Sequence, residues 1–241
     1  MVGWSVEVPT VSSHIRRYAA GLILLTAATG SIDAVSYLAL DRVFTGNMTG
    51  NVLFIGFALV GVAGIPFLNN VVALAGFVLG SIVSGRIVGR GHTRLLPRRS
   101  VWTLVTGALI IAGLAAVWAV LGELDDRGLL IVTALLAIVM GAQVSAVKPI
   151  GNSDITTIVV TNTLANLARD SRLGGGRGEK WVQRLLAVVA MGGGAALGAA
   201  LIGWMSGAAA LAGGGVLYVA GVLMLSLTSR AERRAESRVG V

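Results

Sequence analysis

The sequence has 241 residues, of which 55% are hydrophobic and only 12% are charged, and its mean hydropathy is +0.84. Soluble domains carry about 25% charged residues, so this chain has too few to cover a water-exposed surface, and we expect a bilayer as its solvent. It contains no cysteine, which excludes disulfides and thiolate metal sites. The net charge of +8 would fit nucleic-acid binding. The charges lie in short clusters between long apolar runs, however, which favours the positive-inside pattern of membrane proteins.

Six apolar segments are long enough to cross a bilayer, which takes about 20 residues. In chain order they are Tyr18–Leu40, Leu68–Val88, Val101–Leu121, Gly128–Val147, Leu185–Trp204 and Ala208–Leu227. We interpret the first as an uncleaved span, because its apolar run is longer than the hydrophobic region of a signal peptide. Two further apolar segments, Thr49–Gly64 and Ile155–Ala168, are shorter. Their length alone allows either a full crossing of a thinned bilayer or entry and return on one side.

The distribution of charge favours return for both short segments. The stretch Arg86–Arg99 carries five arginines and no acid, and further cations lie at Arg16 and Arg17, in Arg169–Arg184 and after Leu227. Positively charged loops stay in the cytoplasm, and all four clusters reach that side only if both short segments re-enter. We therefore expect an all-α integral membrane protein with six transmembrane helices, two re-entrant half-helices and both termini in the cytoplasm.

The two halves of the chain follow the same order of a span, a polar turn, a short segment and two spans. Val43–Gly56 aligns with Ile155–Ala168 at an offset of 112 residues. Three crossings in each half give the halves opposite orientations, an arrangement that recurs in transporters and channels. We expect a single membrane domain over residues 1–241, with two inverted three-helix repeats at about 17–121 and 128–228 and a basic tail at 229–241.

The stretch FTGNMTGN (Phe44–Asn51) places small and polar residues between two apolar segments. Backbone that leaves helical geometry inside a bilayer needs hydrogen-bond partners from the protein, and Gly46 and Gly50 permit close approach. A half-helix that begins here would aim its positive end into the membrane, toward an anion or a carboxylate. Asp33 lies well inside the first span, where an acid costs about 2.5–3.5 kcal/mol and is a functional candidate by default.

These features predict a polar midplane site to which both halves contribute. The candidate substrate-binding residues are Asp33, Thr45, Asn47, Thr49, Gly50, Asn51, Gln143, Thr157, Thr161, Asn162 and Thr163. The alternative for each is a structural role, in which the side chain caps or packs a helix. We expect no catalytic residue, metal site or cofactor, because the sequence offers no Ser/His/Asp or metal-ligand constellation.

Three small-xxx-small motifs, Gly76–Gly80, Gly85–Gly89 and Gly194–Gly198, let helices approach closely. They are typical of internal packing and equally suit a contact between copies in a homo-oligomer. The other expected partners are the lipid bilayer and an unknown small solute, with no nucleic acid.

The first half of the chain resembles a known family. Gly30–Gly56 contains G-x-x-D-A followed by F-x-x-x-x-T-G-N, and is similar to the signature of the YoaK family of bacterial inner-membrane proteins, which carry a domain of unknown function. The family's G-x-Q and its threonine-rich run are matched in the second half by Gly141, Gln143, Thr156, Thr157, Thr161 and Thr163. Asn162 stands where the family has glycine, and Val144 and Ser145 replace its Asn-Ala. The similarity covers about Tyr18–Leu227 and implies a location in the inner membrane, but no substrate.

We expect a small-solute transporter or channel that is not an enzyme. The alternative is a non-transporting membrane assembly or sensor protein whose polar turns are structural. A membrane enzyme would need clustered carboxylates, whereas the sequence places one acid deep within a span.

Overall fold

The computed structural model describes residues 10–91, 96–150, 160–178 and 180–239, and every regular element in these ranges is helical. In chain order the elements are α1 (Thr10–Ala39), α2 (Met48–Leu59), α3 (Phe67–Val88), α4 (Arg98–Leu121), α5 (Asp126–Val147), the 3-10 turn η1 (Lys148–Ile150), α6 (Val160–Arg169), the 3-10 turn η2 (Arg172–Gly174), α7 (Trp181–Trp204) and α8 (Gly207–Val239).

Six of the described helices are long and apolar enough to cross a membrane, namely α1, α3, α4, α5, α7 and α8. The prediction of an all-α membrane protein with six long apolar helices is therefore confirmed. The predicted basic tail continues α8 as helix to Val239. The first short segment overlaps α2, which begins one residue earlier, at Met48, and ends at Leu59. The second overlaps α6, which ends one residue later, at Arg169, and residues 155–159 of this segment lie outside the described residues.

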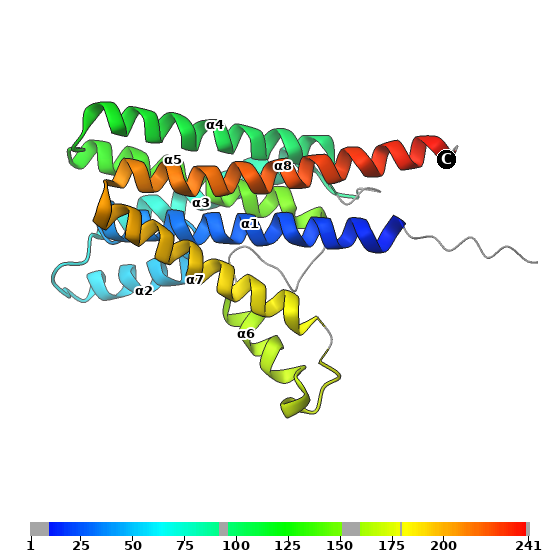
Figure 1. Cartoon of the computed structure of the whole chain (residues 1–241). Helices are drawn as coiled ribbons and strands as arrows, with labels where there is room; N and C mark the ends of the chain where they lie inside the picture. Colours follow the sequence, from blue (N-terminus) through cyan, green and yellow to red (C-terminus); the bar gives the residue numbers. More distant parts are fainter. Residues whose placement is uncertain (1–9, 92–95, 151–159, 179, 240–241) are drawn as a thin grey trace, which may run out of the picture.

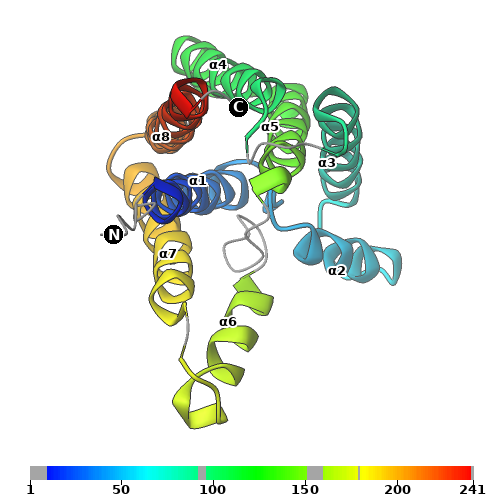
Figure 2. The same ribbon diagram turned by 90° about the vertical axis from the view of Figure 1, so that its right-hand side faces the viewer.

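α1 forms the centre of the bundle, with α5, α7 and α8 around it (Figure 2). In the apolar window of α1 61% of residues are buried, against 17% in α7, so α1 is the helix least available to lipid. α3 packs on α5, α4 packs on α5 and α8, and each short helix packs on the long helix that follows it, α2 on α3 and α6 on α7. α6 and the first half of α7 extend away from the bundle (Figure 1).

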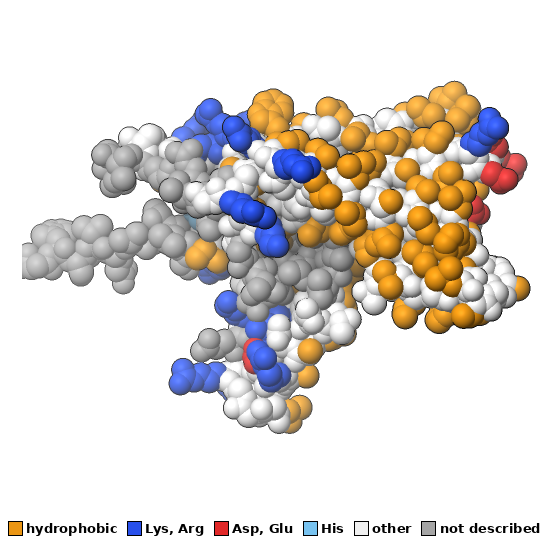
Figure 3. All heavy atoms as spheres, turned by 180° about the vertical axis from the view of Figure 1, so that it is seen from behind, with side chains coloured by type: hydrophobic (Ala, Val, Ile, Leu, Met, Phe, Trp, Pro, Cys, Tyr) orange, Lys and Arg blue, Asp and Glu red, His pale blue; other side chains and the backbone are white. Residues whose placement is uncertain are grey.

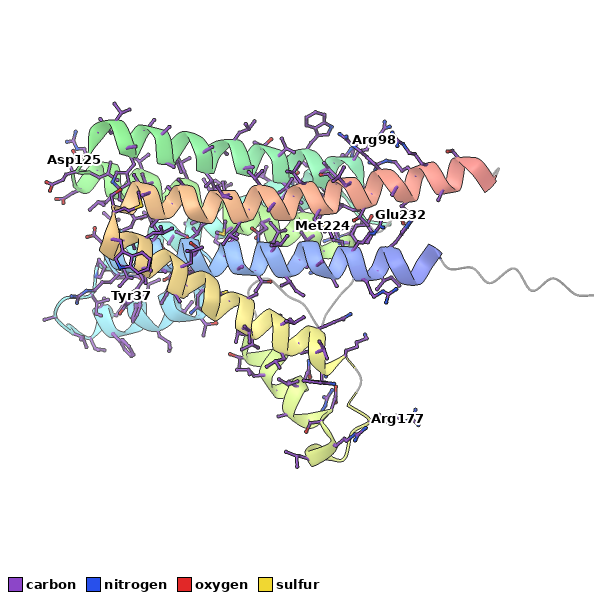
Figure 4. All side chains as sticks on the ribbon, in the orientation of Figure 1. Tyr37, Arg98, Asp125, Arg177, Met224 and Glu232 are labelled. Carbon is purple, nitrogen blue, oxygen red and sulfur yellow. The ribbon has the colours of Figure 1, made fainter. Side chains whose placement is uncertain are left out.

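The two ends of the bundle differ in charge, and on the face seen in Figure 3 hydrophobic side chains gather between them. Many large hydrophobic side chains of the long helices are exposed. We call the end that carries Arg16, Arg86, Arg98 and Lys148 the basic end, and the opposite end, with Asp41, Glu123, Asp125 and Asp126, the acidic end. Figure 4 places Asp125 far from Arg98 and Glu232. A lipid-facing belt between two polar ends is the surface that a membrane-spanning bundle requires.

The crossing of α1 and α7 brings two backbones into direct contact. A Cβ atom on Gly30 would overlap the carbonyl of Met191, and a Cβ atom on Gly194 would overlap the carbonyl of Ala27. Only glycine allows this approach, which fits the use of small residues where helices meet in membranes.

The crossing of α3 and α5 has the same geometry. A Cβ on Gly80 would overlap the carbonyl of Ile138, and a Cβ on Gly141 would overlap the carbonyl of Phe77. The hydroxyl of Ser81 donates a hydrogen bond of 3.0 Å to the Gly141 carbonyl, which adds a polar contact to the crossing.

The three small-residue motifs therefore differ in use. Gly76–Gly80 faces α5 and Gly194–Gly198 faces α1, so both serve packing within the chain. Gly85 is exposed, and a Cβ there would meet no atom within 4 Å. The pattern of small residues is the same in all three motifs, and only the packing distinguishes them.

Candidate functional site

Asp33 is the organising residue of the polar turn that follows α1. Its side chain is buried, with 6% of the residue exposed. The Oδ1 atom accepts hydrogen bonds from the backbone N–H groups of Gly46 (2.7 Å) and Thr45 (3.1 Å). The chain after α1 thus runs back beside that helix to the level of Asp33. α2 begins at Met48, two residues after Gly46. Its positive N-terminal end therefore lies close to the Asp33 carboxylate and stabilises the negative charge.

Gly46 is required by the closeness of this approach. A Cβ atom at this position would lie 2.9 Å from Cγ2 of Thr29 and 3.1 Å from Oδ2 of Asp33. Thr45 is fully buried beside it. The turn is therefore pressed against the face of α1 that carries Thr29 and Asp33.

Asn51 closes the same turn from the α2 side. It is fully buried, its Nδ2 donates to the Phe44 carbonyl at 2.6 Å, and its Oδ1 accepts from the Phe44 N–H at 3.0 Å. Gly50 lies under the Phe44 ring, where a Cβ would come within 2.8 Å of Cδ2. Both residues therefore have a structural role, which answers the need of non-helical backbone for partners inside a membrane.

Stacked aromatic rings hold α2 against α1. The rings of Tyr37 and Phe44 stack with centroids 5.0 Å apart, and Phe44 stacks on Phe54 at 6.1 Å. Tyr37 lies one helical turn after Asp33 and is seen nearer to Asp125 than to Arg98 in Figure 4. Asp33 and Tyr37 thus anchor the returning chain at two successive turns of α1.

Gln143 joins this group from α5, across the centre of the bundle. It is fully buried, and its Nε2 donates a hydrogen bond of 3.1 Å to the Thr29 hydroxyl. The Thr29 hydroxyl in turn donates to the Leu25 carbonyl at 2.9 Å. Since a hydroxyl has one proton, Thr29 can only accept from Gln143. This fixes the orientation of the amide and leaves its Oε1 pointing elsewhere.

Two buried acceptor atoms in this cluster have no hydrogen-bond partner in the described part of the chain. They are Oδ2 of Asp33 and Oε1 of Gln143. A buried polar atom without a partner costs about 1–3 kcal/mol, so such atoms usually have a reason. Thr29 lies 12 residues from both Arg17 and Asp41, about 18 Å along the helix in each direction. The cluster of Thr29, Asp33 and Gln143 is therefore near the middle of the span.

Asn47 lies beside the cluster, because it follows Gly46 directly and its backbone N–H faces the Asp33 carboxylate, while its side chain makes no capping bond on α2. The remaining predicted site residues lie elsewhere. Thr49 is exposed on α2, and Thr161 and Asn162 are exposed on α6. Thr163 is buried, and Thr157 lies outside the described residues. The structure thus brings Thr45 to Asp33 and Gln143 to Thr29, one turn away on the same helix, but leaves Thr161 and Asn162 exposed on α6.

The second short helix is held instead by an ion-pair network with α7. Arg184, which is 7% exposed, donates to the Asn166 carbonyl at 2.9 Å and to Asp170 Oδ2 at 2.8 Å. The side chain of Arg169 also bonds to Asp170. Hydrogen bonds from Arg169 and then Arg184 lower the pKa of the Asp170 carboxyl below its ordinary value, so this network stays ionised at neutral pH.

Thr29 is not among the site residues predicted from the sequence, although it lies at the centre of the cluster. A signal was available, because Thr29 and Asp33 are separated by four positions and so share a helix face. The pairing of Thr29 with Gln143, across 114 positions, had no such local signal.

Comparison with known proteins supports the same assignment to a family. A family described as "Protein of unknown function (DUF1275)" matches residues 21–224, a range that includes Asp33 and Gln143. The UPF0700 transmembrane protein YoaK of Bacillus subtilis (strain 168) is 34% identical over 149 residues, which is 62% of this chain and 65% of that relative. The match thus spans less than two thirds of the relative's length, and no solved structure matches. The resemblance predicted from the sequence is confirmed, and the chain belongs to the YoaK-type family of membrane proteins of unknown function, DUF1275.

Proposed function

We propose that this protein is a small-solute transporter or channel of the bacterial inner membrane, with a binding site formed by Thr29, Asp33 and Gln143. The observation that carries the proposal is the pair of buried acceptors, Asp33 Oδ2 and Gln143 Oε1, without partners in the described residues. They come from α1 and α5, which belong to different halves of the chain. A midplane site between two halves is the usual position of a substrate site in transporters.

The chemistry of the cluster favours a solute with N–H or O–H donors, and a cation over an anion. Asp33 supplies a carboxylate, and the amide of Gln143 presents its oxygen because its nitrogen is used by Thr29. The donor groups of a bound ammonium or similar solute would supply partners to these acceptors, in place of the water that the solute loses on entering the membrane. An anion would meet two acceptors and one negative charge, which is unfavourable.

The same proposal includes inverted repeats that contain re-entrant helices. Support comes from the two glycine crossings, because Gly141 follows Gly30 by 111 positions and Gly194 follows Gly80 by 114, close to the offset of 112 from the sequence. In both crossings each glycine faces the carbonyl three residues before its partner glycine. The α1–α7 and α5–α3 crossings are thus equivalent pairs in which the halves exchange roles.

Re-entry of α2 is supported by the contact between the two ends of its segment. Asn69, near the start of α3, donates a hydrogen bond of 2.8 Å to Asp41, just after α1. This contact supports a path in which residues 42–66 leave and return at the acidic end. With the basic end in the cytoplasm, both termini lie on that side.

Single-cysteine labelling tests this topology on a chain that has no native cysteine. We expect Ala63→Cys, in the exposed loop after α2, to react with an impermeant maleimide added outside intact cells, as Glu123→Cys at the acidic end does. Ser237→Cys, near the end of α8, should react only after the membrane is opened. Protection of Ala63→Cys together with Ser237→Cys would mean that α2 crosses the membrane fully.

Solute binding tests the site itself. We expect a small amine or other cationic metabolite to raise the thermal midpoint of the purified protein by mass action, and this shift to disappear in Asp33→Asn and in Gln143→Leu. Glu123→Gln removes the same charge from an exposed position and should keep the shift. If a broad cation and metabolite screen shifts neither the wild type nor Glu123→Gln, the cluster is structural, and the non-transporting assembly or sensor role becomes the better account.

A further inference from the structure

A second polar site lies at the basic end, between α3 and the end of α5. A cavity of about 950 Å³ opens there. Its lining includes Ser81, Gly85, Arg86 and Arg90 from α3 and the chain just after it, and Ser145 and Lys148 from the end of α5 and η1. It is separate from the cluster of Thr29, Asp33 and Gln143, none of which lines it.

The cavity is strongly electropositive. Arg86, Arg90 and Lys148 line it, and none of the described residues in its lining is acidic. None of these three cations pairs with a carboxylate in the described part of the chain, where Arg169 and Arg184 pair with Asp170. The C-terminal ends of α3 and α5 contribute about half a negative charge each, so roughly two positive charges of the described lining remain uncompensated.

The inner wall of the cavity is held in place by bonds between the two helices. The Ser81 hydroxyl donates to the Gly141 carbonyl at 3.0 Å, and the Ser145 hydroxyl donates to the Ser81 carbonyl at 3.0 Å. These bonds fix the distance between α3 and α5 at the inner end of the cavity. The shape of the cavity is therefore set by the packing of these two long helices.

One flank of the cavity continues onto lipid-facing surface. Ile82 lines the cavity and is 44% exposed, and Leu79, Val83 and Ile87 on the same helix are 45–52% exposed. Cations beside an apolar helix face at the cytoplasmic level are the arrangement that holds anionic lipid headgroups. The apolar flank offers a place for acyl chains, and the cations offer partners for phosphate oxygens.

We propose that this cavity is a phosphate-binding site, which takes the anionic phosphate of a lipid headgroup or a free phosphate compound. Arg86 and Arg90 provide planar groups that suit phosphate oxygens, and Lys148 provides a point charge from the opposite wall. The phosphate site shares no residue with the proposed solute site, so this proposal does not depend on the proposed transport function.

A glycine at the cavity wall provides a test that leaves every charge in place. Gly85→Phe puts a ring into the cavity, and because a Cβ at Gly85 meets no atom within 4 Å, the fold should tolerate it. Gly113→Phe is the matched control, since Gly113 is an exposed glycine of α4 whose Cβ also meets nothing. The thermal midpoint of each purified protein is measured in detergent with added phosphatidylglycerol, phosphatidylcholine or inorganic phosphate.

We expect phosphatidylglycerol to raise the midpoint of the wild type and of Gly113→Phe, with an affinity at least about tenfold weaker in Gly85→Phe. The same pattern with inorganic phosphate alone would identify a free phosphate compound as the ligand. Equal protection of all three proteins, or protection of none, would overturn the proposal, because binding would then not depend on the cavity.

Charge removal provides a second, independent readout. Replacing Arg86, Arg90 and Lys148 with glutamine should weaken the same binding about a hundredfold. Replacing the exposed Arg16, Arg17 and Arg234 changes the net charge equally and should have little effect. Equal losses in both triple variants would show that general surface charge is responsible, and would also overturn the proposal.

Discussion

Gly194→Leu should abolish the stable fold, with an expected loss of about 3 kcal/mol or more in the free energy of unfolding. The Cβ atom of any larger residue would overlap the backbone carbonyl of Ala27 on α1. Backbone cannot move aside as a flexible side chain can, so α1 and α7 would have to separate. That separation would also open the contact four residues later, where a Cβ on Gly198 would lie 2.6 Å from the Ser31 carbonyl.

The matched control is the preceding residue. Gly193 is exposed on the same helix, and its Cβ would meet no atom within 4 Å, so Gly193→Leu should fold as the wild type does. The measurement is the midpoint of denaturation in detergent, together with the fraction of monodisperse protein. A stable Gly194→Leu variant would mean that α1 and α7 do not cross as described. If the repeats are equivalent, Gly80→Leu should be as damaging as Gly194→Leu, because it forces apart the corresponding crossing of α3 and α5.

Asp33→Ala should cost about 2–4 kcal/mol of stability, whereas Asp33→Asn should cost about 1 kcal/mol or less. Alanine removes the acceptor for the N–H groups of Thr45 and Gly46 and leaves two buried donors without partners. Hydrogen bonds to a charged group contribute about 1.5–3 kcal/mol each, partly offset by the cost of burying the carboxylate. Asparagine keeps an oxygen at the same place and can still accept both bonds.

Thr26→Ala is a suitable control for this comparison. Thr26 is buried on the same helix, and within the described residues its hydroxyl bonds only to the Leu22 carbonyl, one turn earlier, so the loss of this bond should cost about 1 kcal/mol or less. The measurement is again denaturation in detergent, which reports the structural role of Asp33 separately from its proposed role in solute binding. Equal stability of Asp33→Ala and the wild type would contradict the view that this carboxylate holds the turn.

The sequence by itself determined the positions of the membrane spans and of the polar turn. A transmembrane helix must be apolar over about 20 successive residues and must satisfy its backbone within itself, so span positions depend on local composition. For this reason all six long helices contain the predicted spans, with one residue of difference at Leu40. The motif from Asp33 to Asn51 likewise identified the polar turn and the family, because the residues of the turn and those of the family signature lie in the same short stretch of sequence.

Only the tertiary structure decided which polar and small residues meet. Gln143 contacts Thr29, while Thr161 and Asn162 lie exposed on α6. Likewise Gly76–Gly80 packs against α5, while Gly85, in a motif of the same form, lines an open cavity. Such differences depend on the shape of two helix surfaces that are distant in sequence, because packing in a membrane is a matter of complementary volumes and backbone approach. The composition and residue spacing of one helix do not determine which other helix packs against it.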